Sequence, residues 1–300
     1  MLGPNRGIVV RGTLLALTAS YLLAGTALVA GPAAAEQWHD PDFAAGVKAL
    51  NLKSTSVLVM TQGGDRVLFA KNEDAVVPIA SITKLMTALV VLDAWLPPGE
   101  LIAISKDDRD GLKGTQSRLQ VGMKITRDDL LRLALMASEN RAAAALARAY
   151  PGGTSAFVAA MNQKAVELGM WKTRFVDGTG LSSSNVSTAR DLGRLVSAAY
   201  RQPLIREYTT RTDHTVMLPK GRRMNFWNSN RLVKNPGWEI GLSKTGYISE
   251  AGRCLVMQAR IASTPVVIVL LDSWGKLTRV ADANRIKKWI ESNTSRPSAG

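Results

Sequence analysis

The chain has 300 residues but only one cysteine and two histidines. A disulfide needs two cysteines, so the single Cys254 excludes an internal disulfide, and the fold must rely on its apolar core. Cys254 lies in the run "RCLVMQARI", where we expect a buried packing residue rather than a reactive thiol. With only His39 and His214 present, an H-E-x-x-H zinc motif is excluded, and we expect neither a metal nor an organic cofactor. His214, in "RTDHTVML", is expected at a strand edge rather than in catalysis.

Charge is missing altogether from residues 13–30. This apolar run follows Arg6 and Arg11 and precedes an A-x-A cleavage site at residues 33–35, which is the organisation of an export signal. We therefore expect residues 1–35 to be a signal peptide, and the mature protein to be periplasmic or otherwise exported to the cell envelope. The run is also about long enough to cross a bilayer, so an uncleaved N-terminal anchor is the alternative.

Acidic residues are in short supply, since 24 Asp and Glu stand against 38 Lys and Arg. Losing the two arginines of the signal would lower the formal charge only from +14 to +12. Outside the cytoplasm, a cationic surface favours lipid headgroups, acidic wall polymers or carboxylate-bearing peptides rather than nucleic acid. We expect no nucleic-acid partner and keep open a peripheral contact with the membrane or with wall polymers. A merely soluble cationic surface is the plain alternative.

Strand patterns occur at both ends of the mature chain. "STSVLVM" and "RVLFAKN" flank residues 62–65 and predict a hairpin. Further strands are expected at "TVMLP", "EIGLSK", "RCLVMQARI" and "PVVIVLLD", of which the last two are joined by the short connection 262–264. One mixed sheet made from the two ends of the chain follows from this pattern.

Helical patterns fill the middle of the chain. A helix is expected to begin around Ser81 and to stop before Pro97-Pro98. Thr126, Thr154 and Thr188 are the expected N-caps of three more helices, and a last helix is expected over residues 276–290. The apolar side of this last helix is expected to pack on the sheet, with binding to a membrane surface as the alternative.

These elements predict a mixed α/β protein of the α+β type, in which a mostly antiparallel sheet is flanked by helices. We expect one domain over residues 36–292, an all-α subdomain within it at about 105–205, and a polar tail at 293–300. A cleft between the sheet and the subdomain is the natural place for a site.

The stretch "PIASITKLMTALV" places Ser81 and Lys84 three residues apart in an apolar, helix-forming run. On a helix this spacing brings the two side chains within hydrogen-bonding reach. Serine is a poor nucleophile until a base takes its proton, and lysine is such a base only when burial or another cation lowers its pKa from about 10.4 toward 7. The apolar surroundings and a helix N-terminus near Ser81 favour this chemistry. Taken alone, the pair also fits an N-cap serine beside a solvated lysine.

Two more stretches give the pair a context. "MASENRAAAAL" supplies Ser138 and Asn140 between two helices, and "GLSKTGYISEAG" supplies Lys244, Thr245 and Gly246 within a strand pattern. The set S-x-x-K, S-x-N and K-T-G, in this order, is typical of penicillin-binding proteins and class A β-lactamases.

On these motifs the chain resembles the low-molecular-mass penicillin-binding proteins, which are serine D-Ala-D-Ala peptidases of the S11 family. The resemblance extends over "SENRAAAALARAYPGG", "FVDGTGLSSSNVSTARDL" and "GLSKTGYISEAGRCLVM" and is greatest to the D-alanyl-D-alanine endopeptidase branch. It implies a β-lactamase/transpeptidase-like fold, peptidoglycan peptide side chains as substrates, and β-lactam antibiotics as covalent inhibitors. One departure is Gly178 in "DGTG", where proline is expected.

The resemblance also implies a role for each matched residue. Ser81 would attack a D-alanyl amide and become the acyl-ester, Lys84 would accept its proton, Ser138 would relay a proton to the leaving amine, and Asn140 would hold Lys84 and the substrate amide. On the opposite wall, the charge of Lys244 would lower the pKa of Lys84, and Lys244 and Thr245 would bind a substrate carboxylate. Gly246 would leave room for the substrate backbone, and the N–H groups of Ser81 and Tyr247 would form the oxyanion hole.

Three alternatives to an endopeptidase stay open. A class A β-lactamase needs a carboxylate in an E-x-x-x-N stretch between S-x-N and K-T-G, and none of the glutamates between these motifs has asparagine four residues on. A non-catalytic wall-binding protein has no need of intact motifs. A D-alanyl-D-alanine carboxypeptidase uses the same catalytic set, but S-E-N in place of the usual S-G-N, and a chain that ends without the additional β-domain and amphipathic anchor of those enzymes, favour the endopeptidase. Trp227 is a candidate glycan contact.

Overall fold

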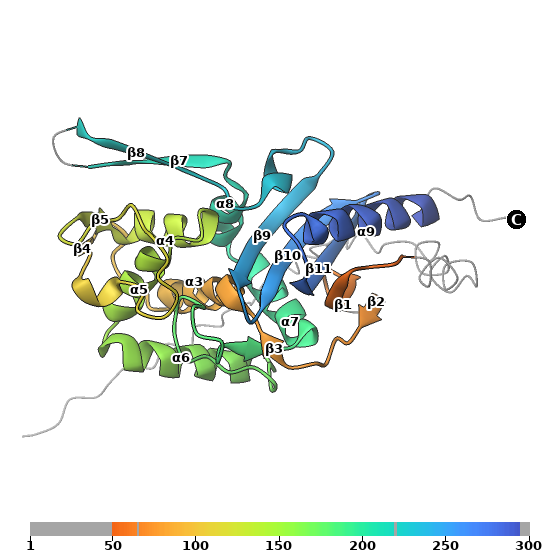
Figure 1. Ribbon diagram of the computed structural model, residues 1–300, viewed down its shortest axis with the longest axis horizontal. Helices are drawn as coiled ribbons and strands as arrows, with labels where there is room; N and C mark the ends of the chain where they lie inside the picture. The colour runs from red at the N-terminus through yellow and green to blue at the C-terminus, as the bar shows by residue number, and fades with distance from the viewer. Residues whose placement is uncertain (1–49, 65, 219–220, 295–300) are drawn as a thin grey trace, which may run out of the picture.

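The structure is a computed structural model that describes residues 50–64, 66–218 and 221–294. Residues 1–35, predicted as the signal, lie outside the described residues, as does most of the predicted tail. The described chain forms a sheet with helices on both faces and a helical part beside it (Figure 1). No helix of the described residues is long and apolar enough to cross a membrane.

The central sheet has five antiparallel strands in the order β2-β1-β11-β10-β9. The two ends of the chain meet in it, because Ser54 pairs with Ser273. The predicted hairpin between β10 and β11 is present, but its loop has two residues rather than the three expected at 262–264, because Thr264 already pairs with Ile261, and residues 262 and 263 have left-handed φ of 45° and 66°. The strands are β1 (Ser54–Thr61), β2 (Val67–Lys71), β9 (Glu239–Ile248), β10 (Gly252–Ile261) and β11 (Thr264–Ser273).

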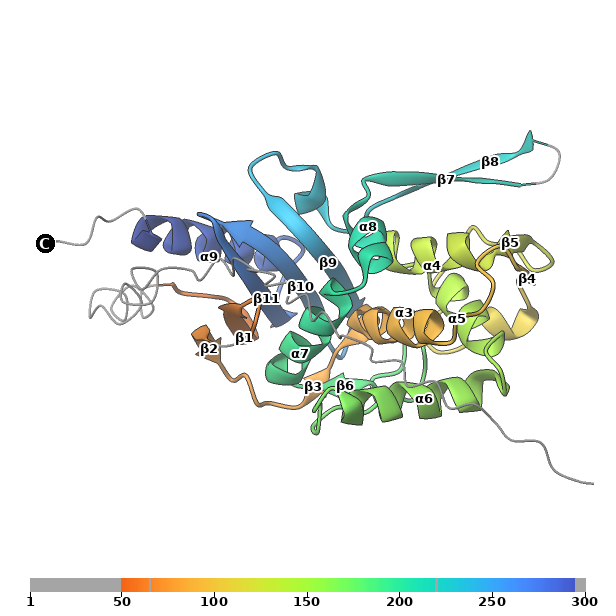
Figure 2. The same ribbon diagram turned by 180° about the vertical axis from the view of Figure 1, so that it is seen from behind.

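Alternate residues of β11 enter two different apolar cores, one on each face of the sheet. On one face, Val267 and Val269 pack with α7 (Ala189–Tyr200) and the helical part. On the other face, Ile268 and Leu270 pack with Ala283, Ile286 and Ile290 of α9 (Thr278–Thr294). This confirms the expected packing of the last helix. Figures 1 and 2 show α7 and α9 on opposite faces.

Short helices build the part beside the sheet. The first begins as the 3-10 turn η2 (Ala80–Thr83) and continues as α3 (Lys84–Asp93). Thr126 and Thr188 are N-caps as predicted, since their hydroxyls accept from the N–H groups of Asp129 and Asp191. The other elements are η3 (Lys106–Asp108), α4 (Arg127–Met136), α5 (Asn140–Arg148), α6 (Gly153–Glu167) and α8 (Pro203–Thr210), with the short strand pairs β3 (Val77–Pro78) with β6 (Val186–Ser187) and β4 (Leu101–Ala103) with β5 (Lys124–Thr126).

The prediction that Thr154 caps a helix is wrong. Gly152 is the N-cap of α6, and Gly152 and Gly153 have φ of 83° and 74°. Because glycine adopts these left-handed angles freely, the helix is capped two residues earlier than predicted and Thr154 falls inside the first helical turn.

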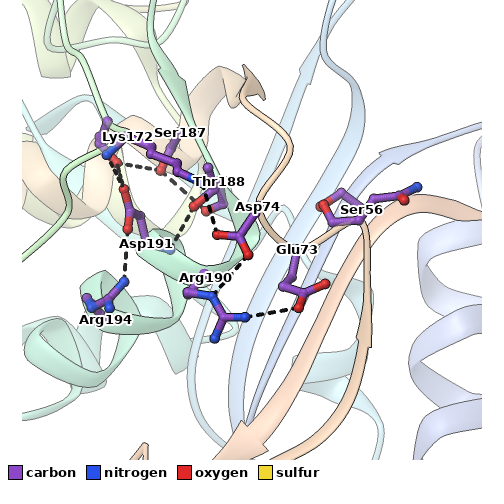
Figure 3. A network of polar contacts seen from close by, with 11 residues as sticks. Ser56, Glu73, Asp74, Lys172, Ser187, Thr188, Arg190, Asp191 and Arg194 are labelled. Carbon is purple, nitrogen blue, oxygen red and sulfur yellow. Dashed lines mark hydrogen bonds and ion pairs between the residues drawn. The ribbon is translucent and has the colours of Figure 1, made fainter.

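A polar network holds the segment that leads from β2 to the turn at Ser81 (Figure 3). Arg190 of α7 pairs with Glu73 and Asp74, and its N–H donates to the carbonyl of Glu73. In the same helix, Asp191 accepts from the backbone N–H of Lys172 and pairs with Arg194. Exposed ion pairs add little energy singly, but this set fixes the segment to the sheet-covering helix.

The hairpin of β7 (Asp213–Met217) and β8 (Arg223–Trp227) extends past α4 (Figure 1). His214 lies in β7, where its Nε2 is 2.7 Å from Asp129 Oδ1 of α4. After β8 the chain passes the 3-10 turn η5 (Arg231–Lys234) and enters β9.

Candidate active site

Ser81 lies where η2 packs against β9. The residue before it, Ala80, has a φ of 47°, a conformation that side-chain-bearing residues rarely adopt. Gly180 lies directly behind, since a Cβ at Gly180 would be 2.0 Å from the carbonyl oxygen of Ala80. The tight approach of Gly180 and the strained Ala80 together fix the turn that presents Ser81.

Lys84 is fully buried beside Ser81. Its Nζ lies 2.8 Å from Ser81 Oγ and donates to Asn140 Oδ1 at 2.7 Å and to the carbonyl oxygen of Thr179 at 2.6 Å. Burial lowers the pKa of Lys84 from 10.5 to about 7, while the carboxylates of Asp177 and Glu139 act in the opposite direction. The amine is therefore available as a base near neutral pH.

Ser138 and Lys244 meet across the cleft. Ser138 lies between α4 and α5 with a φ of 60°, and its Oγ accepts from Lys244 Nζ at 2.8 Å. Lys244 also donates to the carbonyl of Thr245. Its pKa lies well below 10.5 because it is buried, and Lys84 and Arg279 lower it further by repulsion. Repulsion between the two lysines was expected to lower the pKa of Lys84, but it lowers the pKa of Lys244 instead. The low pKa of Lys84 comes from its burial.

The rest of the K-T-G strand borders Ser81. A Cβ at Gly246 would lie 3.1 Å from the backbone N of Ser81 and from the carbonyl oxygen of Ile79, so a side chain there would push β9 and the Ser81 turn apart by a few tenths of an ångström. Thr245 Oγ1 donates to Ser229 Oγ at 2.7 Å. Tyr247 is about half exposed, and the guanidinium of Arg253 stacks on its ring. The structure therefore brings together all eight residues predicted for the site, namely Ser81, Lys84, Ser138, Asn140, Lys244, Thr245, Gly246 and Tyr247.

Four further groups at the site carry no motif in the sequence. The carbonyl of Thr179 accepts from Lys84, and Thr115 Oγ1 accepts from Asn140 Nδ2 at 3.0 Å. Ser229 bonds Thr245, and Arg279 of α9 donates to the carbonyl of Gly246 at 2.9 Å. Backbone carbonyls have no sequence signature, and the other three residues come from loops or helices far from the motifs along the chain.

The loop 176–185 positions Thr179 through one carboxylate. Asp177 Oδ1 accepts from the N–H groups of Thr179 and Gly180, and its Oδ2 accepts from the N–H of Ser182. Gly178, where proline was expected, has little space: a Cβ there would lie 3.1 Å from a ring carbon of Phe157. Its carbonyl instead accepts from the buried Thr87 hydroxyl at 2.6 Å.

A cationic cavity of about 380 Å³ adjoins Thr245. Its lining includes the hydroxyl residue Ser229 and the cations Arg231, Arg253, Lys276 and Arg279, with no acidic residue among the described lining. Such a cavity suits anionic groups of a substrate. In contrast, the described residues hold no cluster of three His, Cys, Asp or Glu side chains that could bind a metal.

Comparison with known proteins agrees with this geometry. The model of the S11 peptidase family, described as D-alanyl-D-alanine carboxypeptidase, matches residues 43–275. The chain belongs to this family. The D-alanyl-D-alanine endopeptidase of Pseudomonas aeruginosa is 51% identical to this S11 peptidase over 242 residues, which are 80% of this chain and 78% of that protein.

Solved structures give the fold of this S11 peptidase. The Streptomyces K15 DD-transpeptidase superposes with a TM-score of 0.74 at 29% identity, covering 80% of this chain and 97% of that one. Penicillin-binding protein D2 of Listeria monocytogenes, in its ampicillin-bound form, superposes with a TM-score of 0.70 at 29% identity, covering 80% and 98%. The predicted β-lactamase/transpeptidase-like fold is confirmed.

Proposed function

We propose that this S11 peptidase is a D,D-endopeptidase that hydrolyses D-alanyl amide bonds of peptidoglycan cross-links through a Ser81 acyl-enzyme. The observation that carries the proposal is the 2.8 Å contact between the buried amine of Lys84 and Ser81 Oγ. An amine with a pKa of about 7 is uncharged in a large share of molecules at neutral pH, so it can take the serine proton. A wall-binding scaffold without catalysis has no use for this arrangement.

The hydrogen bonds of Lys84 determine where the lone pair of its amine points. A neutral amine has two N–H bonds and one lone pair. Asn140 Oδ1 and the carbonyl of Thr179 use the two N–H bonds, which leaves the lone pair for the hydroxyl of Ser81. As Oγ bonds to the D-alanyl carbonyl carbon, its proton passes to Lys84 and the carbonyl oxygen becomes negative.

The backbone N–H groups of Ser81 and Tyr247 are the proposed donors to this oxyanion, each worth about 3–4 kcal/mol. The close approach of Gly246 to Ser81 N supports this placement. The carbon–nitrogen bond then breaks as the leaving amine takes the hydroxyl proton of Ser138, which accepts from Lys244, and the proton held by Lys84 replaces it, so Lys84 is neutral again. Lys84 then takes a proton from water as the water oxygen bonds to the acyl carbon, the ester bond to Ser81 Oγ breaks, and Lys84 returns the proton to Ser81.

The leaving strand distinguishes an endopeptidase from a carboxypeptidase. A carboxypeptidase releases one D-alanine, whereas an endopeptidase releases a longer peptide with further carboxylates. The cationic cavity next to Thr245 offers about 380 Å³ for such a strand. The endopeptidase from Pseudomonas aeruginosa adds support. Trimming of terminal D-alanine is the second candidate, because the family description names a carboxypeptidase and the same catalytic groups serve both reactions.

β-Lactams are proposed to acylate Ser81 and to remain bound, as the ampicillin-bound Listeria monocytogenes protein suggests. We also propose that the apolar segment before residue 36 exports the protein to the periplasm or cell envelope. There its positive charge would favour contact with wall polymers or the membrane surface.

Digestion of purified muropeptides tests the proposal. Cross-linked dimers and uncross-linked pentapeptides are each incubated with the protein and with Ser81→Ala, and products are separated by chromatography. We expect loss of dimers with the native protein and none with Ser81→Ala. If free D-alanine were released while the dimers stayed intact, the protein would be a carboxypeptidase and not an endopeptidase.

A further inference from the structure

The base of the β7–β8 hairpin exposes an aromatic side chain next to the active site. Trp227, the last residue of β8, is 57% exposed. Its neighbours face the body of the protein, since Phe226 is buried and Asn228 Nδ2 donates to the carbonyls of Thr209 and Arg211. β8 ends at Trp227, and two residues further on the chain bends at Ser229, where the N–H of Asn230 donates to Asn228 Oδ1.

Ser229 ties this side of the hairpin to the catalytic strand. Its Oγ is 2.7 Å from Thr245 Oγ1, and its N–H donates to the carbonyl of Met136 near the S-x-N turn. Two residues span at most about 7 Å of chain, so the Cα of Trp227 lies within that distance of the Cα of Ser229, which contacts the K-T-G strand.

Arg118 forms the other half of this surface. Its guanidinium carbon is 4.1 Å from the ring centre of Phe226 and 5.8 Å from that of Trp227. Three residues earlier, Thr115 accepts from Asn140 of the active site. Among the described residues, no carboxylate pairs with Arg118, so a cation held on aromatic rings keeps its N–H groups for a ligand.

We infer that Trp227 and Arg118 form a shelf that binds the sugar-proximal part of the wall peptide, with an amino-sugar ring on the indole and a peptide carboxylate on the guanidinium. The inference rests on the proposed function, which supplies a substrate with peptides joined to amino sugars. An indole gives a large apolar face at low entropic cost, and a guanidinium binds carboxylates in a bidentate manner. The shelf therefore selects strands still attached to their glycan.

Two forms of one substrate test the shelf: a cross-linked dimer with its disaccharides, and the same peptide dimer after an amidase has removed the sugars. We expect the native protein to have a lower KM for the sugar-bearing dimer. Trp227→Ala should raise that KM about tenfold, leaving kcat and the KM for the bare peptide unchanged, and Arg118→Gln should raise the KM for both. Trp95→Ala, which removes a 92% exposed tryptophan at the far end of α3, is the matched control and should change neither.

The rate of acylation by benzylpenicillin reports whether the cleft is intact, because this small ligand does not reach the shelf. We expect it to be unchanged in Trp227→Ala. Equal KM values for the two dimers in the native protein, or a Trp227→Ala variant that matches Trp95→Ala, would overturn the shelf. A Trp227→Ala variant that acylates more slowly would overturn it also, since Trp227 would then support the cleft. If the native protein cleaves neither dimer, the proposed function itself is wrong.

Discussion

Lys244 Nζ donates to Ser138 Oγ at 2.8 Å and so joins β9 to the turn between α4 and α5 across the cleft. The two walls of the active site are thereby connected by a catalytic hydrogen bond. A change on either side acts on both the position of the walls and the chemistry between them.

Replacement of Ser138 separates these two effects. Ser138→Ala and Ser138→Gly both remove the hydroxyl, and each should lower the acylation rate by about 10²–10⁴-fold, the usual size of a proton-transfer contribution. Ser138 has a φ of 60°, so glycine fits the backbone better than alanine, and Ser138→Gly should be the more stable variant by about 1 kcal/mol. Urea denaturation and stopped-flow labelling with a fluorescent penicillin measure the two quantities. Full activity of the more stable variant would exclude a proton relay through Ser138.

The pKa of Lys84 predicts the pH dependence of acylation. Burial lowers this pKa to about 7, so the amine is charged and inactive as a base below pH 7 and becomes neutral as the pH rises. The acylation rate with benzylpenicillin should therefore increase between pH 6 and 8 and level off above. Lys84→Arg stays charged throughout and should lose at least about 10²-fold at every pH. A flat native profile across this range would contradict a neutral Lys84 as the base.

Gly180 should tolerate no side chain. A methyl group there would lie 2.0 Å from the carbonyl oxygen of Ala80, and φ is 79°. Gly180→Ala should lower the free energy of unfolding by about 3 kcal/mol or more and slow acylation, because relief of the clash displaces Ser81. Gly64 has the same φ with nothing within 4 Å of the added carbon, so Gly64→Ala should cost only about 1 kcal/mol and leave acylation unchanged. If denaturant titration gave the two variants equal free energies of unfolding, the predicted clash between a side chain at Gly180 and the carbonyl of Ala80 would be wrong.

Asp177 should act on catalysis through the loop that carries Thr179. Asp177→Asn keeps the size of the side chain but replaces one acceptor oxygen with a donor, so at least one N–H of the loop loses its partner, at a cost of about 1–3 kcal/mol. The displaced Thr179 carbonyl should hold Lys84 less well, and the acylation rate should fall. The carboxylate of the exposed Asp213 accepts from the neighbouring Thr212 hydroxyl, far along the chain from the loop 176–185, and Asp213→Asn is the control, with no change expected in either measurement.

The sequence predicted the parts of the site that depend on side-chain chemistry at fixed local spacing. Ser81 and Lys84 are one turn apart, the S-x-N motif is a three-residue stretch from the turn after α4 to the start of α5, and the K-T-G motif lies on β9, so their residue types were sufficient. The sheet could be predicted because its strands alternate or are continuously apolar. Two features were not predicted from the sequence. One is the contacts between distant segments, such as that of the Thr179 carbonyl with Lys84. The other is the N-cap of α6, which two glycines at positive φ move two residues earlier, from Thr154 to Gly152.

The pairing of β1 with β11 has a consequence for how the protein is made. Ser54 finds Ser273 only 219 positions later in the chain, and Lys244 lies on the strand that completes the same sheet. At about 5–20 residues per second, a ribosome needs roughly 10–40 s to cover that distance. A newly made chain can pair its first strand with β2 early but must leave the β11 edge of that strand open until almost all of it has been synthesised, and a fragment that ends before β9 lacks the Lys244 wall of the cleft.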